Sequence, residues 1–164
     1  MRNEKAELSH VGDDNRPGMV DVSGKDTTLR EATARSVVVL PDAVLALVDD
    51  GEIQGKKGPV FQTAIIAGTM AVKRTADLIP FCHPLQIDRC DVKIRMNDSR
   101  EVEIDCRVSV HARTGVEMEA LVGASTAALT VYDMCKSVSH EIRIRETGLL
   151  HKSGGKRDVD LSSL

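Results

Sequence analysis

Two segments of alternating apolar and polar residues, Ile87–Met96 and Glu101–Val110, constrain the fold of this chain most strongly. Successive side chains of a strand point to opposite faces, so a two-residue period predicts two strands that each bury one face. The four polar residues NDSR connect the segments, which predicts an antiparallel hairpin. Its apolar face is predicted to hold Val92, Ile94, Met96, Val102, Ile104, Cys106, Val108 and Val110.

Two longer apolar segments predict helices instead. In Val60–Leu78 the apolar and small residues recur with a period near 3.6, and their face includes Ala64 and Gly68, which permits close approach of another element. The second helix is predicted over residues 114–136, and it contains the small residues Gly123, Ala124, Ala127 and Ala128.

Shorter patterns complete the predicted elements. The β-branched run Val37–Leu40 predicts a short strand, and EIRIR at 141–145 predicts another. Pro41 is expected to begin a helix that ends near Gly51. The sequences GEIQGKKG (51–58) and HKSGGKRDVDLSSL (151–164) are predicted as loops.

The order of these elements predicts an α+β fold, with an antiparallel sheet and helices packed on one of its faces. A parallel βαβ arrangement fits less well, because the central strands alternate and are not uninterrupted apolar runs. The length of 164 residues suits one domain. The polar residues 1–18 are interpreted as a disordered N-terminal arm.

Composition excludes several functional classes. Aromatic residues make up only 2% of the chain, which argues against stacking of nucleic-acid bases, and the net charge of −3 provides no global attraction for polyanions. The four cysteines form no C-x-x-C pair, so no structural zinc site is expected. Residues 1–18 contain no apolar signal-peptide core, and no uninterrupted apolar run is long enough for a membrane span. We therefore expect a reduced, cytoplasmic protein that binds neither nucleic acid nor membrane.

The long helix carries charged residues at both ends. Glu117 and Glu119 stand near its start, and Asp133 and Lys136 near its end. Because Glu119 and Asp133 are separated by about 21 Å along the axis of a straight helix, one chain cannot bring them to a single reacting atom. Either the helix packs antiparallel on its own copy across a two-fold axis, or the ends belong to unrelated sites. The small residues of the helix favour the first arrangement unless they only pack within the chain, and Asp133 with Lys136 can also be an ordinary surface ion pair.

Three further motifs are candidates for chemistry. GKKGPVF places Lys56 and Lys57 before a helix, as in a phosphate site, although a solvated loop has the same composition. His83 in PFCHP is held between two prolines, which suits an acid/base group or a metal ligand as well as a structural histidine. HKSGGKR can be a phosphate-closing flap or a solvated tail. Taken together, the amines, acids and one imidazole predict a phosphorylated small substrate and acid/base chemistry at its phosphate.

Several blocks of this sequence resemble the MoaC family, the molybdenum cofactor biosynthesis proteins known as cyclic pyranopterin monophosphate synthases. The blocks are MVDVSGK, KKGPVF, AIIAGTMAVKRTADLIPFCHPL, TGVEMEAL, ALTVYDMCK and KSGGK, and they extend from Met19 to Lys156. The resemblance implies a catalytic domain over residues 19–157, with 158–164 as a flexible tail. It also implies a ferredoxin-like α+β fold, and a hexamer of three dimers with active sites at the dimer interface.

The activity implied by the resemblance is conversion of 3′,8-cyclo-7,8-dihydroguanosine 5′-triphosphate into cyclic pyranopterin monophosphate, with release of pyrophosphate. Asp133, Lys57 and Lys136 would be catalytic. The residues implied to bind substrate are Asp21, Lys25, Phe81, Cys82, His83, Glu117, Met118, Glu119 and Lys152. No metal site and no resident cofactor are implied, and Mg²⁺ accompanying the triphosphate is left open. The sequence departs from the family pattern at Pro59 and at Arg157–Asp158.

Two other functional classes compete with this interpretation. A non-catalytic nucleotide-binding module of ferredoxin-like fold would need the phosphate contacts but not the set of carboxylates and lysines. A metal-dependent hydrolase built on His83 and Cys82 would need further ligands, and no second histidine stands at ligand spacing.

Overall fold

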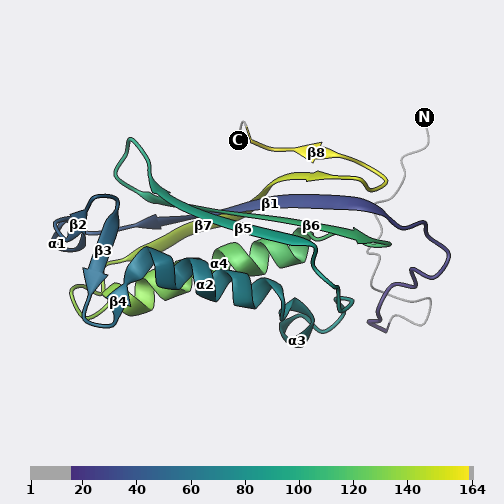
Figure 1. Cartoon of the computed structure of the whole chain (residues 1–164), viewed down its shortest axis with the longest axis horizontal. Helices are drawn as coiled ribbons and strands as arrows, with labels where there is room; N and C mark the ends of the chain where they lie inside the picture. The colour runs from purple at the N-terminus through teal and green to yellow at the C-terminus, as the bar shows by residue number, and fades with distance from the viewer. Residues whose placement is uncertain (1–15, 163–164) are drawn as a thin grey trace.

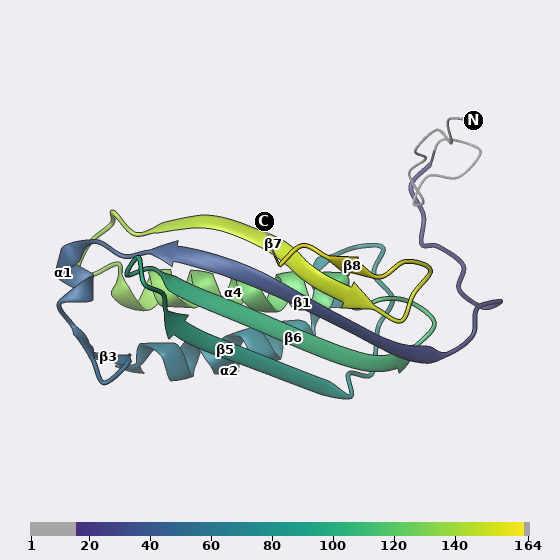
Figure 2. The same cartoon turned by 90° about the horizontal axis from the view of Figure 1, so that it is seen from above.

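The computed structural model describes residues 16–162, so the first fifteen residues of the expected N-terminal arm lie outside the described part. The main sheet is antiparallel and has five strands in the order β5-β6-β1-β7-β8. Helices α2 and α4 lie side by side beneath one face of this sheet, as Figures 1 and 2 show together. The strands are β1 (Thr28–Val39), β5 (Arg89–Met96), β6 (Val102–Ala112), β7 (Arg143–Ser153) and β8 (Val159–Asp160). The helices are α1 (Asp42–Leu45), α2 (Val60–Val72), α3 (Thr75–Leu78) and α4 (Glu117–Cys135).

The chain order β1-α2-β5-β6-α4-β7 is the βαββαβ succession of ferredoxin-like folds. The predicted α+β class, with helices packed on one face of an antiparallel sheet, is therefore confirmed. A small three-stranded sheet of β2 (Val48–Asp49), β3 (Glu52–Gly55) and β4 (Gly58–Pro59) is inserted before α2.

The predicted hairpin is confirmed as β5 and β6, which pair from Arg89 opposite Ser109 to Met96 opposite Val102. The alternation buries one face of β6 completely or nearly so, through Val102, Ile104, Cys106, Val108 and Val110. The opposite face carries charge. Asp105 accepts hydrogen bonds from Arg35 of β1 at 2.6 Å and from Arg95 of β5 at 2.8 Å, so neighbouring strands are cross-linked on their open side.

The small residues of α4 pack within the chain, and they do not support helix pairing between copies. A Cβ atom added at Gly68 of α2 would lie 2.9 Å from the carbonyl oxygen of Gly123. One added at Gly123 would lie 2.6 Å from Cys106 Sγ and from Val72 Cγ2. Together with the buried Ala124, Ala127 and Ala128, these glycines let α4 approach both α2 and the sheet. Of the two explanations for the small residues of α4, packing within the chain is therefore the correct one.

Several predicted boundaries at the N-terminal side were wrong. The first strand covers Thr28–Val39 and not only Val37–Leu40, because its buried positions Ala32 and Ala34 have side chains too small to give an apolar pattern. The helix predicted after Pro41 ends at Leu45. Asp50 and Gly51 have positive φ angles and turn the chain from β2 to β3, so the loop predicted at 51–58 contains two short strands.

The long helices also end differently from the prediction. The helix expected over Val60–Leu78 is interrupted after Val72, where the Thr75 hydroxyl donates to the Val72 carbonyl at 3.1 Å and α3 begins. Helix α4 begins at Glu117 and not at Thr114.

The C-terminal loop prediction was wrong for residues 151–153 and 159–160. The strand expected at 141–145 continues to Ser153, and β8 then pairs with it, so part of the predicted loop belongs to the sheet. No helix within residues 16–162 is both long and apolar enough to cross a bilayer.

Candidate active site

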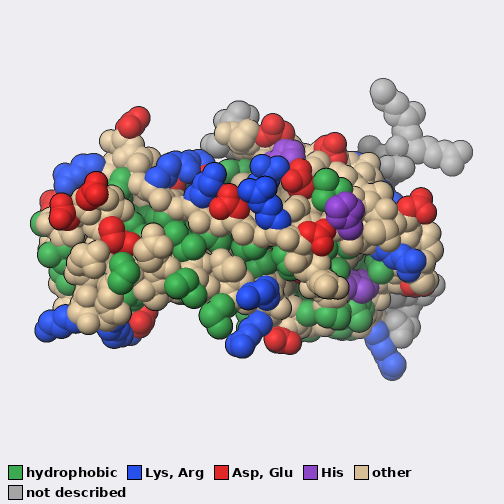
Figure 3. Space-filling view, viewed as in Figure 1, with side chains coloured by type: hydrophobic (Ala, Val, Ile, Leu, Met, Phe, Trp, Pro, Cys, Tyr) green, Lys and Arg blue, Asp and Glu red, His purple; other side chains and the backbone are tan. Residues whose placement is uncertain are grey.

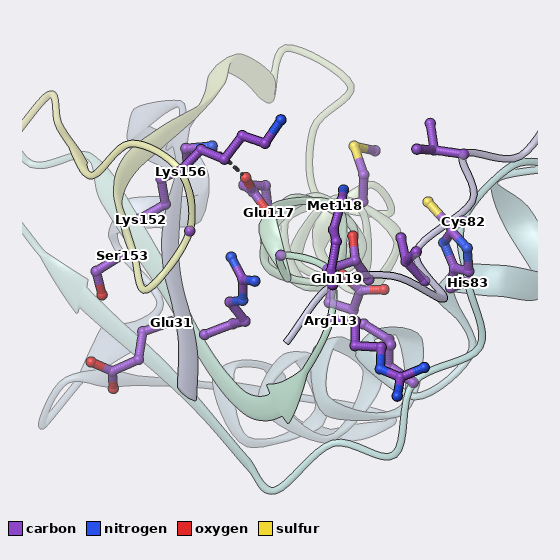
Figure 4. A pocket seen from close by; sticks show the side chains of 18 of the residues that line it. Glu31, Cys82, His83, Arg113, Glu117, Met118, Glu119, Lys152, Ser153 and Lys156 are labelled. Carbon is purple, nitrogen blue, oxygen red and sulfur yellow. Dashed lines mark hydrogen bonds and ion pairs between the residues drawn. The ribbon is translucent and has the colours of Figure 1, made fainter. Parts of the chain in front are cut away.

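A cavity of about 570 Å³ opens where the start of α4, the end of β7 and the turn after α3 converge. Figure 4 shows side chains from these segments facing one another across it. Eight of the twelve predicted site residues line this cavity: Lys25, Phe81, Cys82, His83, Glu117, Met118, Glu119 and Lys152. Residues far apart in the sequence are thus brought together by the fold.

The start of α4 supplies the acids of the cavity. Glu117 folds back over Gly115, where a Cβ atom would lie 2.0 Å from Glu117 Oε2, so a side chain at position 115 would displace this carboxylate. Glu117 Oε1 accepts a hydrogen bond from Lys152 Nζ of β7 at 2.8 Å. No side chain caps the first turn of α4, and Glu117 is therefore used to join the helix to the sheet rather than as a cap.

Glu119 is the buried acid of the site, with 4% of its surface exposed. Burial raises its pKa to about 7, and the neighbouring carboxylate of Glu117 adds to this rise, while a hydrogen bond from its own backbone N–H opposes it. A carboxyl group with a pKa near neutrality can give or accept a proton under ordinary conditions. Glu119 therefore has the properties of an acid/base group as well as of a substrate contact.

The segment between Pro80 and Pro84 brings Phe81, Cys82 and His83 to the cavity, and it is irregular as predicted. Burial raises the pKa of the Cys82 thiol, and the charge of Glu119 adds to that effect. Figure 4 shows Cys82 and His83 at the opposite end of the cavity from Lys152 and Ser153.

Asp21 is the predicted residue nearest to this cavity that does not line it. Its carboxylate accepts a hydrogen bond from the Ser23 backbone N–H at 2.8 Å. This bond lowers the pKa of Asp21, with a smaller contribution from the charge of His83. The side chains on either side of it, Val20 and Val22, do line the cavity.

The cavity has an excess of positive charge. Six basic and three acidic side chains line it. Two of the acids are already paired, Glu117 with Lys152 and Glu31 with Arg107 at 2.8 Å. Within residues 16–162, none of the other five basic side chains forms an ion pair; these are Lys25, Arg30, Arg113, Lys156 and Arg157. Such a site suits a polyanion.

Sequence reasoning missed Arg30, Glu31, Arg113, Ser153 and Arg157 as cavity residues. Arg30 and Glu31 belong to the part of β1 that the alternation did not reveal. Arg113 stands one residue before Thr114 of the TGVEMEAL block. Its position next to this block was the one sequence feature that could have indicated Arg113 as a cavity residue.

The three residues predicted as catalytic form a second cluster. Lys136 Nζ donates a hydrogen bond to Asp133 Oδ1 at 2.6 Å, and Lys57 Nζ lies 3.5 Å from Asp133 Oδ2. Lys136 lowers the pKa of Asp133, and Asp133 raises the pKa of Lys136. Lys57 stands in the turn between β3 and β4, so the small inserted sheet positions it beside the end of α4.

The cavity and this cluster lie at opposite ends of α4. Glu119 belongs to the first turn of the helix and Asp133 to the last, a separation of about 21 Å along the axis. All three side chains of the cluster are about half exposed or more, with 70%, 52% and 48% of the side-chain surface exposed for Lys57, Asp133 and Lys136. One chain thus holds the predicted site residues in two separate groups.

A model of the MoaC family matches residues 19–155. The chain belongs to the MoaC family. A Xanthomonas campestris protein named cyclic pyranopterin monophosphate synthase is 56% identical over 154 residues, which cover 94% of this chain and 93% of that protein. One with the same name from Xanthomonas oryzae is 54% identical over 158 residues, with 96% of each chain covered. A Synechocystis molybdenum cofactor biosynthesis bifunctional protein is 52% identical over 96% of this chain and 46% of its own length.

The MoaC match has a bearing on the two groups of side chains. Its range contains the whole Lys57–Asp133–Lys136 cluster and most of the cavity. It ends before Lys156 and Arg157, two of the unpaired cations of the cavity.

Within residues 16–162, no three His, Cys, Asp or Glu side chains are grouped so that they could hold a metal ion.

Proposed function

We infer that this MoaC protein is a cyclic pyranopterin monophosphate synthase, a lyase of molybdenum cofactor biosynthesis. The observation that carries this conclusion is its 56% identity over 154 residues to a protein of that name. The geometry agrees with the chemistry, because a cavity of about 570 Å³ lined by five unpaired cations suits a small substrate that bears several phosphates. The substrate class of the family is a cyclised dihydroguanosine triphosphate.

The last part of this reaction closes a cyclic phosphate. A hydroxyl oxygen of the substrate forms a bond to the α-phosphorus, the bond from that phosphorus to the bridging oxygen of the β-phosphate breaks, and pyrophosphate leaves. The hydroxyl proton must pass to a base, and the charge on the phosphates must be balanced. Unpaired lysine and arginine side chains support the second requirement. Glu119, with its pKa near 7, is a candidate for proton transfer.

We assign Lys57 and Lys136 to acid/base work and to phosphate or ring contacts, with Asp133 holding Lys136 charged and oriented. Glu119 and His83 bind the pterin and hydroxyl edge of the substrate, and Lys152 closes over it. The 2.6 Å hydrogen bond from Lys136 to Asp133 supports the orienting role. The arrangement of the cavity residues supports the substrate contacts.

Because the cluster and the cavity are about 21 Å apart in one chain, we propose that the complete site forms between two copies. The cluster of one copy would face the cavity of the next, as in the hexamer of three dimers that the family resemblance implies. The surface offers apolar area for such contacts: Ile66 and Met70 of α2 and Leu129 of α4 are 61%, 45% and 59% exposed. Hydrophobic side chains reach the surface over the helix layer in Figure 3, whereas the sheet side is densely charged.

The direct test is turnover by the purified protein. Incubation with 3′,8-cyclo-7,8-dihydroguanosine 5′-triphosphate is expected to yield cyclic pyranopterin monophosphate and an equal amount of pyrophosphate. Binding of the triphosphate without product would instead identify the rival nucleotide-binding module. We expect turnover without a resident cofactor, and parallel assays with EDTA and with added Mg²⁺ decide whether a metal must accompany the triphosphate. Action in the cytoplasm stays a prediction from the sequence.

A further inference from the structure

The turn that joins β7 to β8, residues 154–158, forms one wall of the cavity. Ser153, Gly155, Lys156 and Arg157 all line it, and Figure 4 shows Lys156 and Ser153 on the side away from Cys82 and His83. Lys156 and Arg157 are exposed, and neither forms an ion pair with any residue in the range 16–162. The turn therefore presents two uncompensated cations to the cavity.

Gly154, at the start of the turn, is held at both of its peptide groups. Its carbonyl accepts a hydrogen bond from Thr28 Oγ1 at 2.9 Å, and its N–H donates to Asp158 Oδ1 at 3.0 Å. Its φ angle is +81°, and a Cβ atom there would lie 1.9 Å from the Leu29 carbonyl oxygen. Only glycine permits this close contact of the turn with β1.

The Asp158 bond closes the turn on itself. It connects the last residue of the turn to the backbone of the first, and the two cations lie between them. The next residue, Val159, pairs with Lys152, so β8 fixes the chain directly after Asp158. On the cavity side, a Cβ atom at Gly155 would lie 2.8 Å from Arg30 Nη1, which places a third cation against the turn.

We propose that Asp158 is a positioning residue, whose carboxylate closes the 154–158 turn so that Lys156 and Arg157 face the cavity and bind substrate phosphates. This rests on the proposed function for the identity of the ligand. Asp158 itself is a carboxylate beside cations, and its charge alone would weaken phosphate binding. The positioning role and a purely electrostatic role therefore predict opposite effects when Asp158 is removed.

The test compares Asp158→Ala and Asp158→Asn, with pyrophosphate as the probe. In Asp158→Ala the acceptor is lost, and we expect the Kd for pyrophosphate by calorimetry and the KM for the triphosphate to rise about tenfold, the scale of one charge-assisted hydrogen bond. The kcat should change less than about twofold, because the turn contacts phosphate and moves no proton. Asp158→Asn keeps an acceptor oxygen and should stay within about threefold of the wild type.

Asp160→Asn is the matched control. Asp160 stands two residues further along β8, and its carboxylate bonds only Ser162 within the described part of the chain, so Kd and KM should not change. Arg157→Ala leaves the Asp158 hydrogen bond in place and tests the phosphate contact separately. If Asp158→Ala does not fold, this variant still tests whether the turn binds phosphate. We expect this variant to raise the Kd for pyrophosphate about fivefold, while Lys93→Ala, on the open sheet face, should not.

An Asp158→Ala protein that folds normally and binds pyrophosphate as tightly as the wild type, or more tightly, overturns the positioning role. A wild-type protein that does not bind pyrophosphate overturns the phosphate assignment. If the wild type binds pyrophosphate but does not turn over the triphosphate, the proposed function fails while the binding series still decides the role of the turn.

Discussion

Lys136 donates a 2.6 Å hydrogen bond to Asp133 three residues before it, in the last turn of α4. An exposed ion pair at this spacing contributes little to stability, because water screens the two charges. Lys57 from a separate sheet comes within 3.5 Å of the same carboxylate. Two amines converging on one exposed acid are poorly explained by stability, and a functional role is the more informative hypothesis to test.

Lys57→Ala and Lys136→Ala should each lower kcat at least ~10²-fold, the scale of one positioned acid/base group. Both residues are well exposed, so the melting temperature should change little. Lys56→Ala is the matched control: it removes an exposed lysine from the same turn, outside the cluster. Near-normal turnover by either variant would remove that lysine from the mechanism.

A mixture of Glu119→Ala and Asp133→Ala proteins should recover activity, if each variant alone is inactive. When subunits exchange freely, half of the dimers are mixed and half of their sites are intact, so about a quarter of wild-type activity is expected. Mass spectrometry of differently tagged subunits verifies the exchange. Proven exchange without recovered turnover would mean that the site is not shared between copies.

Glu119→Gln should change how stability depends on pH. Because the folded protein raises the pKa of this carboxyl to about 7, the native state keeps a proton that the unfolded chain releases above about pH 4.5. Wild-type stability should therefore fall as pH rises from about 5 to 7 and level off above that. Glutamine does not titrate and so removes this loss. Between pH 5 and pH 8 the free energy of unfolding of the variant should therefore rise by about 2–3 kcal/mol relative to that of the wild type.

Urea denaturation at the two pH values measures this difference. Glu141→Gln, which removes an exposed carboxyl, is the control and should follow the wild type. Parallel stability curves for wild type and Glu119→Gln would refute a burial-raised pKa at this position.

Gly123→Ala should destabilise the protein by about 1–3 kcal/mol through overpacking. Its new methyl group would be 2.6 Å from Cys106 Sγ and Val72 Cγ2, and this cost exceeds the gain in helix propensity. Gly148→Ala is the control, because nothing lies within 4 Å of a Cβ atom there. Urea denaturation midpoints of the two variants and of the wild type measure the difference in stability. An unchanged midpoint for Gly123→Ala would contradict the close packing of α4.

The periodic patterns of the chain were sufficient for the long elements that bury large side chains. The alternation in β5 and β6 and the period in α2 reflect which face is buried, and that is a local property. The same reasoning missed most of β1, where Ala32 and Ala34 are buried because α4 lies close to the sheet. It also missed β8, whose two residues are strand only because they pair with β7.

The sequence by itself determined the α+β class, the MoaC motifs and eight of the side chains that line the cavity, because these follow from local periodicity and from the order of residue types. Only the tertiary structure decided how they combine. Pairing of β1 with β6 and β7 brings Arg30 and Ser153 to the end of α4 where Glu119 is buried, and the rigid length of that helix separates them from Lys57, Asp133 and Lys136. Distances between residues remote in the chain depend on packing, and no local pattern encodes them.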